Sequence, residues 1–183
     1  MSLLSFIIII MTLHDLNTLP RQQLIEQLTQ CCASSAWVNK MLPFFPAEDL
    51  VEVLEDAEEQ WYQCSEEDWK EAFARHPKIG DIGSLKKKFA STADPIAIGW
   101  ASGEQSGVDA ASQQTIEALA KRNKEYEKKF GYIFIVCATG KSADEMLGLL
   151  TTRLLNDPKD EIEVAADEQN KITKLRLEKL LND

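Results

Sequence analysis

One segment of this chain has the composition of a β-strand, and the sequence offers no second strand to pair with it. The segment, residues 132–137 (YIFIVC), is rich in β-branched and aromatic residues. A lone strand cannot form a sheet, because its backbone donors and acceptors need partners on a neighbouring strand. We therefore predict an all-α fold: a single-domain multi-helix bundle with one short extended segment near 132–137. A bound ligand could be one partner of that backbone.

Prolines, capping boxes and one glycine mark where the helices should begin and end. Proline is tolerated in the first turn of a helix and stops it elsewhere, and glycine is favoured just beyond a helix end. The first predicted helix starts at Pro20, the second spans 35–42 and ends at Pro43, and the third starts at Pro46. The fourth follows a capping box at 65–68, and the fifth spans 109–130 and ends at Gly131. The sixth follows a capping box at 142–145, and the last runs from 158 to 181. The apolar positions of the helix after Pro46 include Val51, Val53, Ala57 and Trp61.

The chain has the length of one domain, and we assign residues 11–183 to it. Residues 1–10 contain an apolar run that is too short to cross a bilayer and lacks the basic start and cleavage site of a signal peptide. We expect them to be a non-native or disordered extension. The sequence ends Leu181-Asn182-Asp183, without a peroxisomal signal, so a cytoplasmic location is expected.

The net charge and the cysteine spacing indicate which kinds of partner and ligand this protein is not expected to bind. A net charge of −10 argues against nucleic acid, which needs a basic patch, and we expect no membrane partner either. Four cysteines (31, 32, 64 and 137) and two histidines show no metal-binding spacing, so we expect no metal and reduced, mostly buried thiols. The glycines match no nucleotide-binding pattern, and no cofactor is predicted.

His76 is the first candidate for chemistry. A helical pattern runs up to it, and Pro77 forbids continuation and biases His76 toward an extended backbone. An imidazole held in this way is well placed to transfer protons. The competing interpretation is a histidine that caps or packs at a helix end.

A carboxylate and two arginines are the other candidates. Glu104 lies in a glycine-flanked stretch where a backbone can approach a ligand, or it complements the dipole of the next helix. Arg153 and Arg176 lie among apolar neighbours on the last two predicted helices. A partly buried arginine needs a carboxylate, which either the protein or a substrate supplies.

Several short motifs follow one another along the chain: His76-Pro77-x-Ile79-Gly80, Trp100 with Glu104-Gln105-x-Gly107, Asn123-x-x-Tyr126-x-x-Lys129-Phe130-Gly131 leading into Phe134-Ile135, Arg153-x-x-Asn156, and Ile172 with Arg176-Leu177. In order and number they resemble the motifs of OHCU decarboxylases, the 2-oxo-4-hydroxy-4-carboxy-5-ureidoimidazoline decarboxylases of urate degradation. The resemblance extends over most of the chain, from residue 19 to residue 181.

The resemblance implies an all-helical, cofactor-free enzyme that usually dimerises and converts OHCU to (S)-allantoin and CO2. It assigns the catalytic roles to His76, Glu104 and Arg176. The residues that would line the substrate are Pro77, Ala101, Ser102, Gln105, Phe134, Ile135 and Val136. Many relatives carry a hydroxyl residue three positions before the glutamate, where this chain has Ala101.

The implied chemistry suits these side chains. The carbonyl and imine-type ring of OHCU accept the electron pair left by CO2, so neither pyridoxal nor a metal is required. Arg176 would orient the carboxylate, His76 would carry a proton, and Glu104 would hydrogen-bond the ureido or hydroxyl group. Whether His76 acts first as acid or base, and whether Arg176 or Arg153 holds the substrate, stay open.

Two alternatives remain. A non-catalytic acidic helical interaction module would explain the surface charge without a site. Hydrolysis of a ureide ring would need a nucleophile or a metal-held water, and the sequence has neither in recognisable form.

Overall fold

The computed structural model describes residues 11–76 and 113–181. Within these ranges the chain is helical and contains no strand, which confirms the predicted all-α fold. The helices are α1 (Leu13–Thr18), α2 (Arg21–Cys31), α3 (Ser35–Met41), the 3-10 turn η1 (Leu42–Phe44), α4 (Leu50–Tyr62), α5 (Glu66–Phe73), α8 (Gln113–Phe130), α9 (Ala143–Arg153) and α10 (Pro158–Leu181). None of the helices described is long and apolar enough to cross a membrane.

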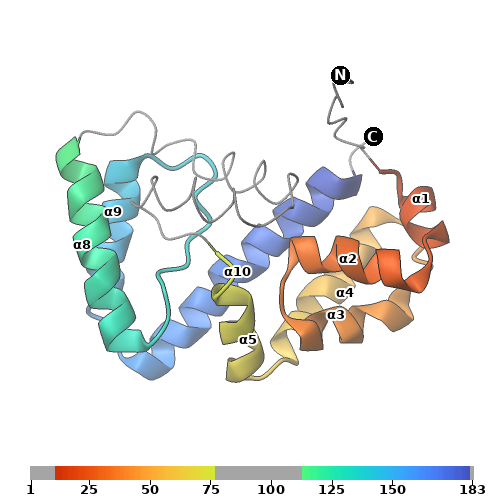
Figure 1. Cartoon of the computed structure of the whole chain (residues 1–183), viewed down its shortest axis with the longest axis horizontal. Coiled ribbons are helices and arrows are strands. Elements are labelled where there is room, and N and C mark those ends of the chain that lie inside the picture. The colour runs from red at the N-terminus through yellow and green to blue at the C-terminus, as the bar shows by residue number, and fades with distance from the viewer. Residues whose placement is uncertain (1–10, 77–112, 182–183) are drawn as a thin grey trace, which may run out of the picture.

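Helix α10 is the element around which the others are arranged (Figure 1). It packs against α2, α4, α5 and α8, while α8 and α9 pack on each other. In Figure 1, α1 to α4 lie toward one end of α10 and α8 and α9 toward the other. Helix α5 lies between the two groups, so its C-terminal end faces the middle of α10.

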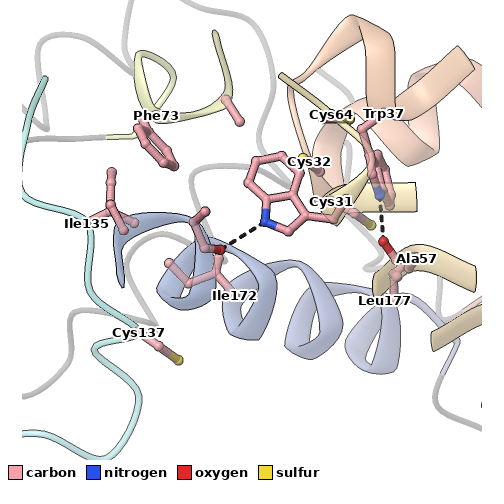
Figure 2. Close-up of a cluster of buried hydrophobic side chains, with 14 of the residues drawn as sticks. Cys31, Cys32, Trp37, Ala57, Cys64, Phe73, Ile135, Cys137, Ile172 and Leu177 are labelled. Carbon is pink, nitrogen blue, oxygen red and sulfur yellow. Dashed lines mark hydrogen bonds between the residues drawn. The ribbon is translucent and has the colours of Figure 1, made fainter. Parts of the chain in front are cut away.

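Buried tryptophans connect the helices of the core. Trp61 of α4 donates its indole N–H to the carbonyl oxygen of Ala166 in α10 at 2.9 Å. Trp37 of α3 donates its indole N–H to the carbonyl oxygen of Ala57 at 2.9 Å (Figure 2). Both side chains are almost fully buried. Because each ring buries a large apolar area and still satisfies its polar atom, the core gains burial without an unpaired donor.

Several helix ends follow the sequence signals. Ser65 and Ser142 each accept a hydrogen bond from the backbone three residues on, and the acid at that position reciprocates, so both predicted capping boxes are confirmed. Gly131 has φ +83°, as expected of the residue just beyond α8, and the last helix spans Pro158–Leu181 as predicted. The predicted start of α8 at residue 109 lies outside the described residues.

Of the two prolines near the end of α3, only Pro46 was misinterpreted. Helix α3 spans Ser35–Met41, within one residue of the predicted 35–42, and Pro43 lies in η1, the 3-10 turn that follows it. Pro46 does not open α4: the Phe45–Pro46 peptide is cis, and α4 begins at Leu50 with Asp49 as its N-cap. Asp49 accepts a hydrogen bond from the backbone N–H of Glu52 at 2.9 Å, a capping contact that a proline cannot make.

Three smaller expectations also change. Val51, predicted as an apolar contact of α4, is 61% exposed. Pro20 is the N-cap of α2 rather than its first helical residue. Helix α1 was not predicted, although Thr12 and Asp15 form a capping box at its start.

All four cysteines are buried and none is in a disulfide, which agrees with the expectation of buried thiols.

Candidate active site

The extended segment 132–137 connects α8 to α9 through the interior of the protein. Every residue from Tyr132 to Ala138 is at most 9% exposed. Gly131 allows the sharp exit from α8, because its positive φ is readily adopted only by glycine. A buried backbone without a partner strand must find hydrogen bonds elsewhere.

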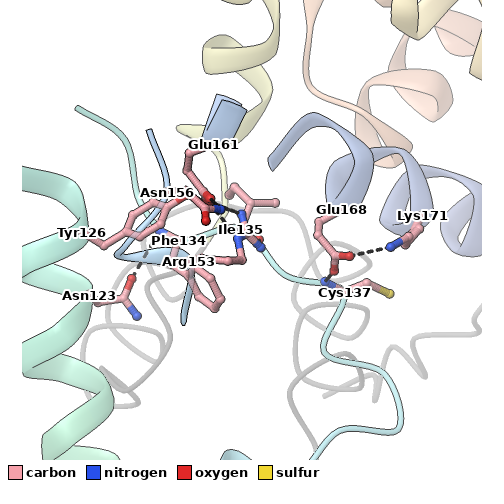
Figure 3. A network of polar contacts seen from close by, with 10 residues as sticks. All are labelled: Asn123, Tyr126, Phe134, Ile135, Cys137, Arg153, Asn156, Glu161, Glu168 and Lys171. Carbon is pink, nitrogen blue, oxygen red and sulfur yellow. Dashed lines mark hydrogen bonds and ion pairs between the residues drawn. The ribbon is translucent and has the colours of Figure 1, made fainter. Parts of the chain in front are cut away.

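Side chains from three helices (Figure 3), together with Lys141 from the loop before α9, supply those hydrogen bonds. Asn123 of α8 accepts from the N–H of Phe134 at 3.3 Å, and Arg153 of α9 donates to the carbonyl oxygen of Ile135 at 2.7 Å. The N–H of Cys137 donates to Glu168 of α10 at 2.7 Å, and its carbonyl oxygen accepts from Lys141 at 2.7 Å. Protein side chains thus make the backbone hydrogen bonds for which the sequence analysis had considered a bound ligand as a partner.

Arg153 is the centre of a buried polar network. Its guanidinium forms an ion pair with Glu161 at 2.6 Å, and the two side chains are 9% and 0% exposed. Asn156 donates to the second oxygen of Glu161 at 2.7 Å, and the hydroxyl of Tyr126 donates to the first. Burial raises the pKa of Tyr126, and although Arg153 opposes this, the bond to Glu161 adds to it, so the phenol stays protonated.

The same guanidinium also contacts the ring of Phe134. Its central carbon lies 4.6 Å from the ring centroid, a cation–π geometry. Because Arg153 is engaged by Glu161, Ile135 and Phe134 at once, its donors serve the protein's own structure. The interpretation of Arg153 as an internal ion pair is confirmed.

Glu168 binds the other end of the segment. Burial alone would raise its pKa, but the hydrogen bonds from Lys171 and from the N–H of Cys137, with the nearby positive charges, lower the pKa overall. The Lys171 contact is 2.6 Å long, and the glutamate side chain is 14% exposed. The carboxylate is therefore ionised at neutral pH and holds the backbone of Cys137 in place.

His76 lies just beyond α5, as the sequence predicted. Its backbone N–H bonds the carbonyl oxygen of Phe73 at 3.1 Å, which closes the last turn. Its ring is partly buried, and Nε2 lies 2.5 Å from Oε1 of Gln169 in α10. Gln169 is 0% exposed and donates from Nε2 to the hydroxyl oxygen of Thr173 at 3.1 Å.

Arg176 lies further along the same helix. It follows Gln169 by seven residues, about two helical turns, so the two side chains project from the same face of α10. The guanidinium is partly buried and donates to the carbonyl oxygen of Cys31 at 3.4 Å. Arg176 and His76 thus lie along one helix face, while Glu161 and Glu168 tie the same helix to the extended segment.

Helix α10 carries Arg176, contacts His76 through Gln169 and contacts the extended segment through the bond from Cys137 to Glu168, while the backbone of Phe134, Ile135 and Val136 lies buried in that segment. The other predicted site residues, Pro77, Ala101, Ser102, Glu104 and Gln105, lie outside the described residues. In the part of the chain that is described, no group of three potential ligands could hold a metal ion.

Sequence reasoning missed the residues that support this site, above all Gln169, Glu168 and Glu161. One signal was available: Gln169 and Thr173 are polar residues four apart within a helix whose inward positions are mostly apolar. Buried polar residues at that spacing usually bond one another or a functional group.

This geometry defines a class of all-helical protein. In it, one helix carries an arginine and contacts both a histidine and a buried extended segment. The profile of the OHCU decarboxylase family matches residues 17–178, and the chain belongs to that family.

Individual relatives agree with this assignment. A protein of Arabidopsis thaliana named uric acid degradation bifunctional protein TTL is 38% identical over 156 residues, which cover 84% of this chain and 46% of that protein. This chain thus spans about half the length of that relative. A 2-oxo-4-hydroxy-4-carboxy-5-ureidoimidazoline decarboxylase of Amia calva is 26% identical over 178 residues and is matched over 95% of its length.

A solved structure is similar as well. The crystal structure of an OHCU decarboxylase in the presence of (S)-allantoin superposes with a TM-score of 0.67 at 36% identity, over 86% of this chain and 99% of that one.

Proposed function

We propose that this protein decarboxylates OHCU to (S)-allantoin and CO2 without a cofactor. One observation carries the proposal: in a chain of the OHCU decarboxylase family, α10 contacts His76, carries Arg176 and bonds the backbone of Cys137 at the end of the extended segment. The relatives named as decarboxylases of this substrate, and the relative crystallised in the presence of (S)-allantoin, support the same substrate and product.

The proposed roles follow from charge and position. Arg176 binds the substrate carboxylate through charge-assisted hydrogen bonds. Its grip on the carboxylate must not be too tight in the ground state, because binding the ground state and the transition state equally well does not accelerate the step. The C–C bond to the carboxylate breaks, CO2 leaves, and the electron pair moves into the adjacent carbonyl and imine-type ring system of the substrate.

His76 then controls the proton. The carbon that loses CO2 must be protonated on one face to give a single enantiomer, and a partly buried imidazole supplies that proton from a fixed direction. Glu104 is proposed to hydrogen-bond the ureido or hydroxyl group. The remaining lining residues are proposed from the family resemblance.

We further propose that the protein is a cytoplasmic homodimer whose single domain spans residues 11–183. The family resemblance supports the dimer, and the buried thiols without disulfides support a reducing compartment. Light scattering of the purified protein measures the oligomeric state directly.

The test of the activity uses the chirality of the product, because OHCU decays spontaneously to racemic allantoin. Freshly generated OHCU should give an allantoin circular dichroism signal with the wild-type protein. His76→Ala and Glu104→Gln should slow its appearance by about 10²- to 10⁴-fold, the usual contribution of general acid–base catalysis.

His14→Ala is the matched control, because His14 is the second histidine and is exposed on α1. Rates within twofold of wild type for both site variants would refute the assigned roles. A wild-type protein that yields only racemic product at the spontaneous rate would favour the interaction module instead.

A further inference from the structure

A buried carboxamide contacts a ring nitrogen of His76. Gln169 is 0% exposed, and its Oε1 lies 2.5 Å from Nε2 of His76. A buried polar side chain that reaches out of a helix to a titratable ring is a candidate for controlling that ring. The proposed mechanism above does not use Gln169.

The orientation of the carboxamide follows from its second contact. Gln169 Nε2 lies 3.1 Å from the hydroxyl oxygen of Thr173. This amide nitrogen donates to the threonine oxygen, so the NH2 group of Gln169 is turned to Thr173 and away from His76.

With its NH2 group turned to Thr173, Gln169 presents only an acceptor to the histidine. A carbonyl oxygen at 2.5 Å from a ring nitrogen requires a proton on that nitrogen. The donors thus run in one direction, from His76 to Gln169 and from Gln169 to Thr173.

We infer that Gln169 is a positioning residue that keeps a proton on Nε2 of His76 and so fixes the tautomer and the orientation in which the ring takes part in catalysis. In the neutral ring the lone pair is on Nδ1, and in the charged ring Nε2–H stays bonded to Gln169 while Nδ1 carries the second proton. The inference rests on the proposed decarboxylation for its catalytic consequence, but the protonation pattern exists without substrate.

Nuclear magnetic resonance of the resting protein tests the pattern directly. The chain has two histidines, so ¹⁵N-histidine labelling gives two ring systems, and His14→Gln assigns them. Long-range ¹H–¹⁵N correlations distinguish the protonated nitrogen from the bare one. We expect His76 to be protonated at Nε2 with a visible, slowly exchanging N–H signal, while the exposed His14 shows none.

Two variants remove the acceptor in different ways. Gln169→Met keeps the volume and loses both hydrogen bonds, so the Nε2–H signal should disappear. Thr173→Val keeps the shape of residue 173 but no longer accepts from Gln169, so the carboxamide can turn and the Nδ1–H form should be populated. Asn170→Leu is the control, because Asn170 is also a buried carboxamide of α10 but bonds Glu58 of α4 at 3.1 Å.

The kinetic expectation separates positioning from structural support. Loss of one neutral hydrogen bond should lower kcat in Gln169→Met by about fivefold to tenfold and leave KM within twofold. The control Asn170→Leu should leave both constants and the His76 ring signals unchanged once the folded fraction is equal.

The possible results are distinguishable. A proton on Nδ1 of His76 in the wild type, or an unchanged Nε2–H signal in both Gln169→Met and Thr173→Val, overturns the inference and leaves the proposed decarboxylase untouched. The expected ring pattern in a protein that yields no (S)-allantoin supports the hydrogen-bond chain and refutes the proposed function.

Discussion

Arg153 donates a hydrogen bond to the backbone carbonyl oxygen of Ile135 at 2.7 Å, from a side chain that is almost completely buried. The bond joins the end of α9 to the middle of the extended segment. Because the same guanidinium is paired with Glu161 of α10, the position of the segment depends on a buried ion pair. Pairs of this kind are costly to break, since the remaining charge has no water to solvate it.

Replacing Glu161 by glutamine should therefore destabilise the protein strongly. Arg153, Tyr126 and Asn156 all donate to this carboxylate, and glutamine would place an NH2 group against one of those donors. We expect Glu161→Gln to lower the free energy of unfolding by about 3 kcal/mol, measured by urea denaturation.

Glu163→Gln provides the matched control, two residues along the same helix and exposed. It should change the free energy of unfolding by less than about 0.5 kcal/mol. Equal effects of the two substitutions would mean that the buried pair contributes nothing special.

Two glycines should respond to alanine with opposite signs. Gly131 has φ +83° and Gly148 lies within α9, and neither has an atom within 4 Å of where a Cβ would stand. The effect of each alanine on stability then depends only on the backbone conformation at that position. Gly131→Ala should destabilise by about 1 kcal/mol and Gly148→Ala should stabilise by about 0.5–1 kcal/mol, both measured by denaturant unfolding. Destabilisation by Gly148→Ala would contradict this explanation.

The stability contributed by Glu168 should depend on pH in the acid range. Its pKa is lowered from 4.5 in the folded state, chiefly because hydrogen bonds and positive charges outweigh burial. A depressed folded pKa means stabilisation that is complete above the unfolded value and is lost as the pH falls through the folded value. The difference in stability between wild type and Glu168→Gln should be constant near neutral pH and shrink steadily below pH 4.5.

Urea unfolding at a series of pH values between neutral and acid measures that difference. Lys171→Met is a useful comparison, because Lys171 is 60% exposed and its own effect should be small. A difference that grows toward acid pH would show that the carboxyl is protonated in the folded protein.

Arg176→Met should impair turnover rather than folding. Loss of a charge-assisted contact to the substrate carboxylate would lower kcat/KM for OHCU by about 10- to 100-fold. Lys179→Met, an exposed cation three residues further along α10, should leave kcat/KM within twofold. If both variants behave alike, the carboxylate is bound elsewhere.

Local chemistry made much of the fold predictable from sequence. Capping at Ser65 and Ser142, the glycine after α8 and the proline at the start of α10 act within one turn, so a single stretch of chain contains the whole signal. The all-α class followed from the lack of a second strand. Pro46 was misinterpreted because the helix-initiating group is the side chain of Asp49, three residues later.

The site residues also divide into those recognisable from local sequence and those that depend on distant contacts. His76 and the arginines were recognisable as single residues of the right chemistry, and the family motifs ordered them. Gln169 and Glu168 were not, because their roles depend on which distant residues α10 meets: Gln169 contacts a histidine 93 positions away. That Arg153 is an internal partner and Arg176 the remaining candidate also required the tertiary contacts.

The arrangement of contacts along α10 constrains how this protein can change during evolution. Glu161, Glu168, Gln169 and Arg176 serve different parts of the site but share one uninterrupted helix. Inserting or deleting one residue between the first and the last would rotate the later side chains by about 100° relative to the earlier ones. Single substitutions can therefore accumulate along α10, whereas changes in its length should be confined to positions outside 161–176.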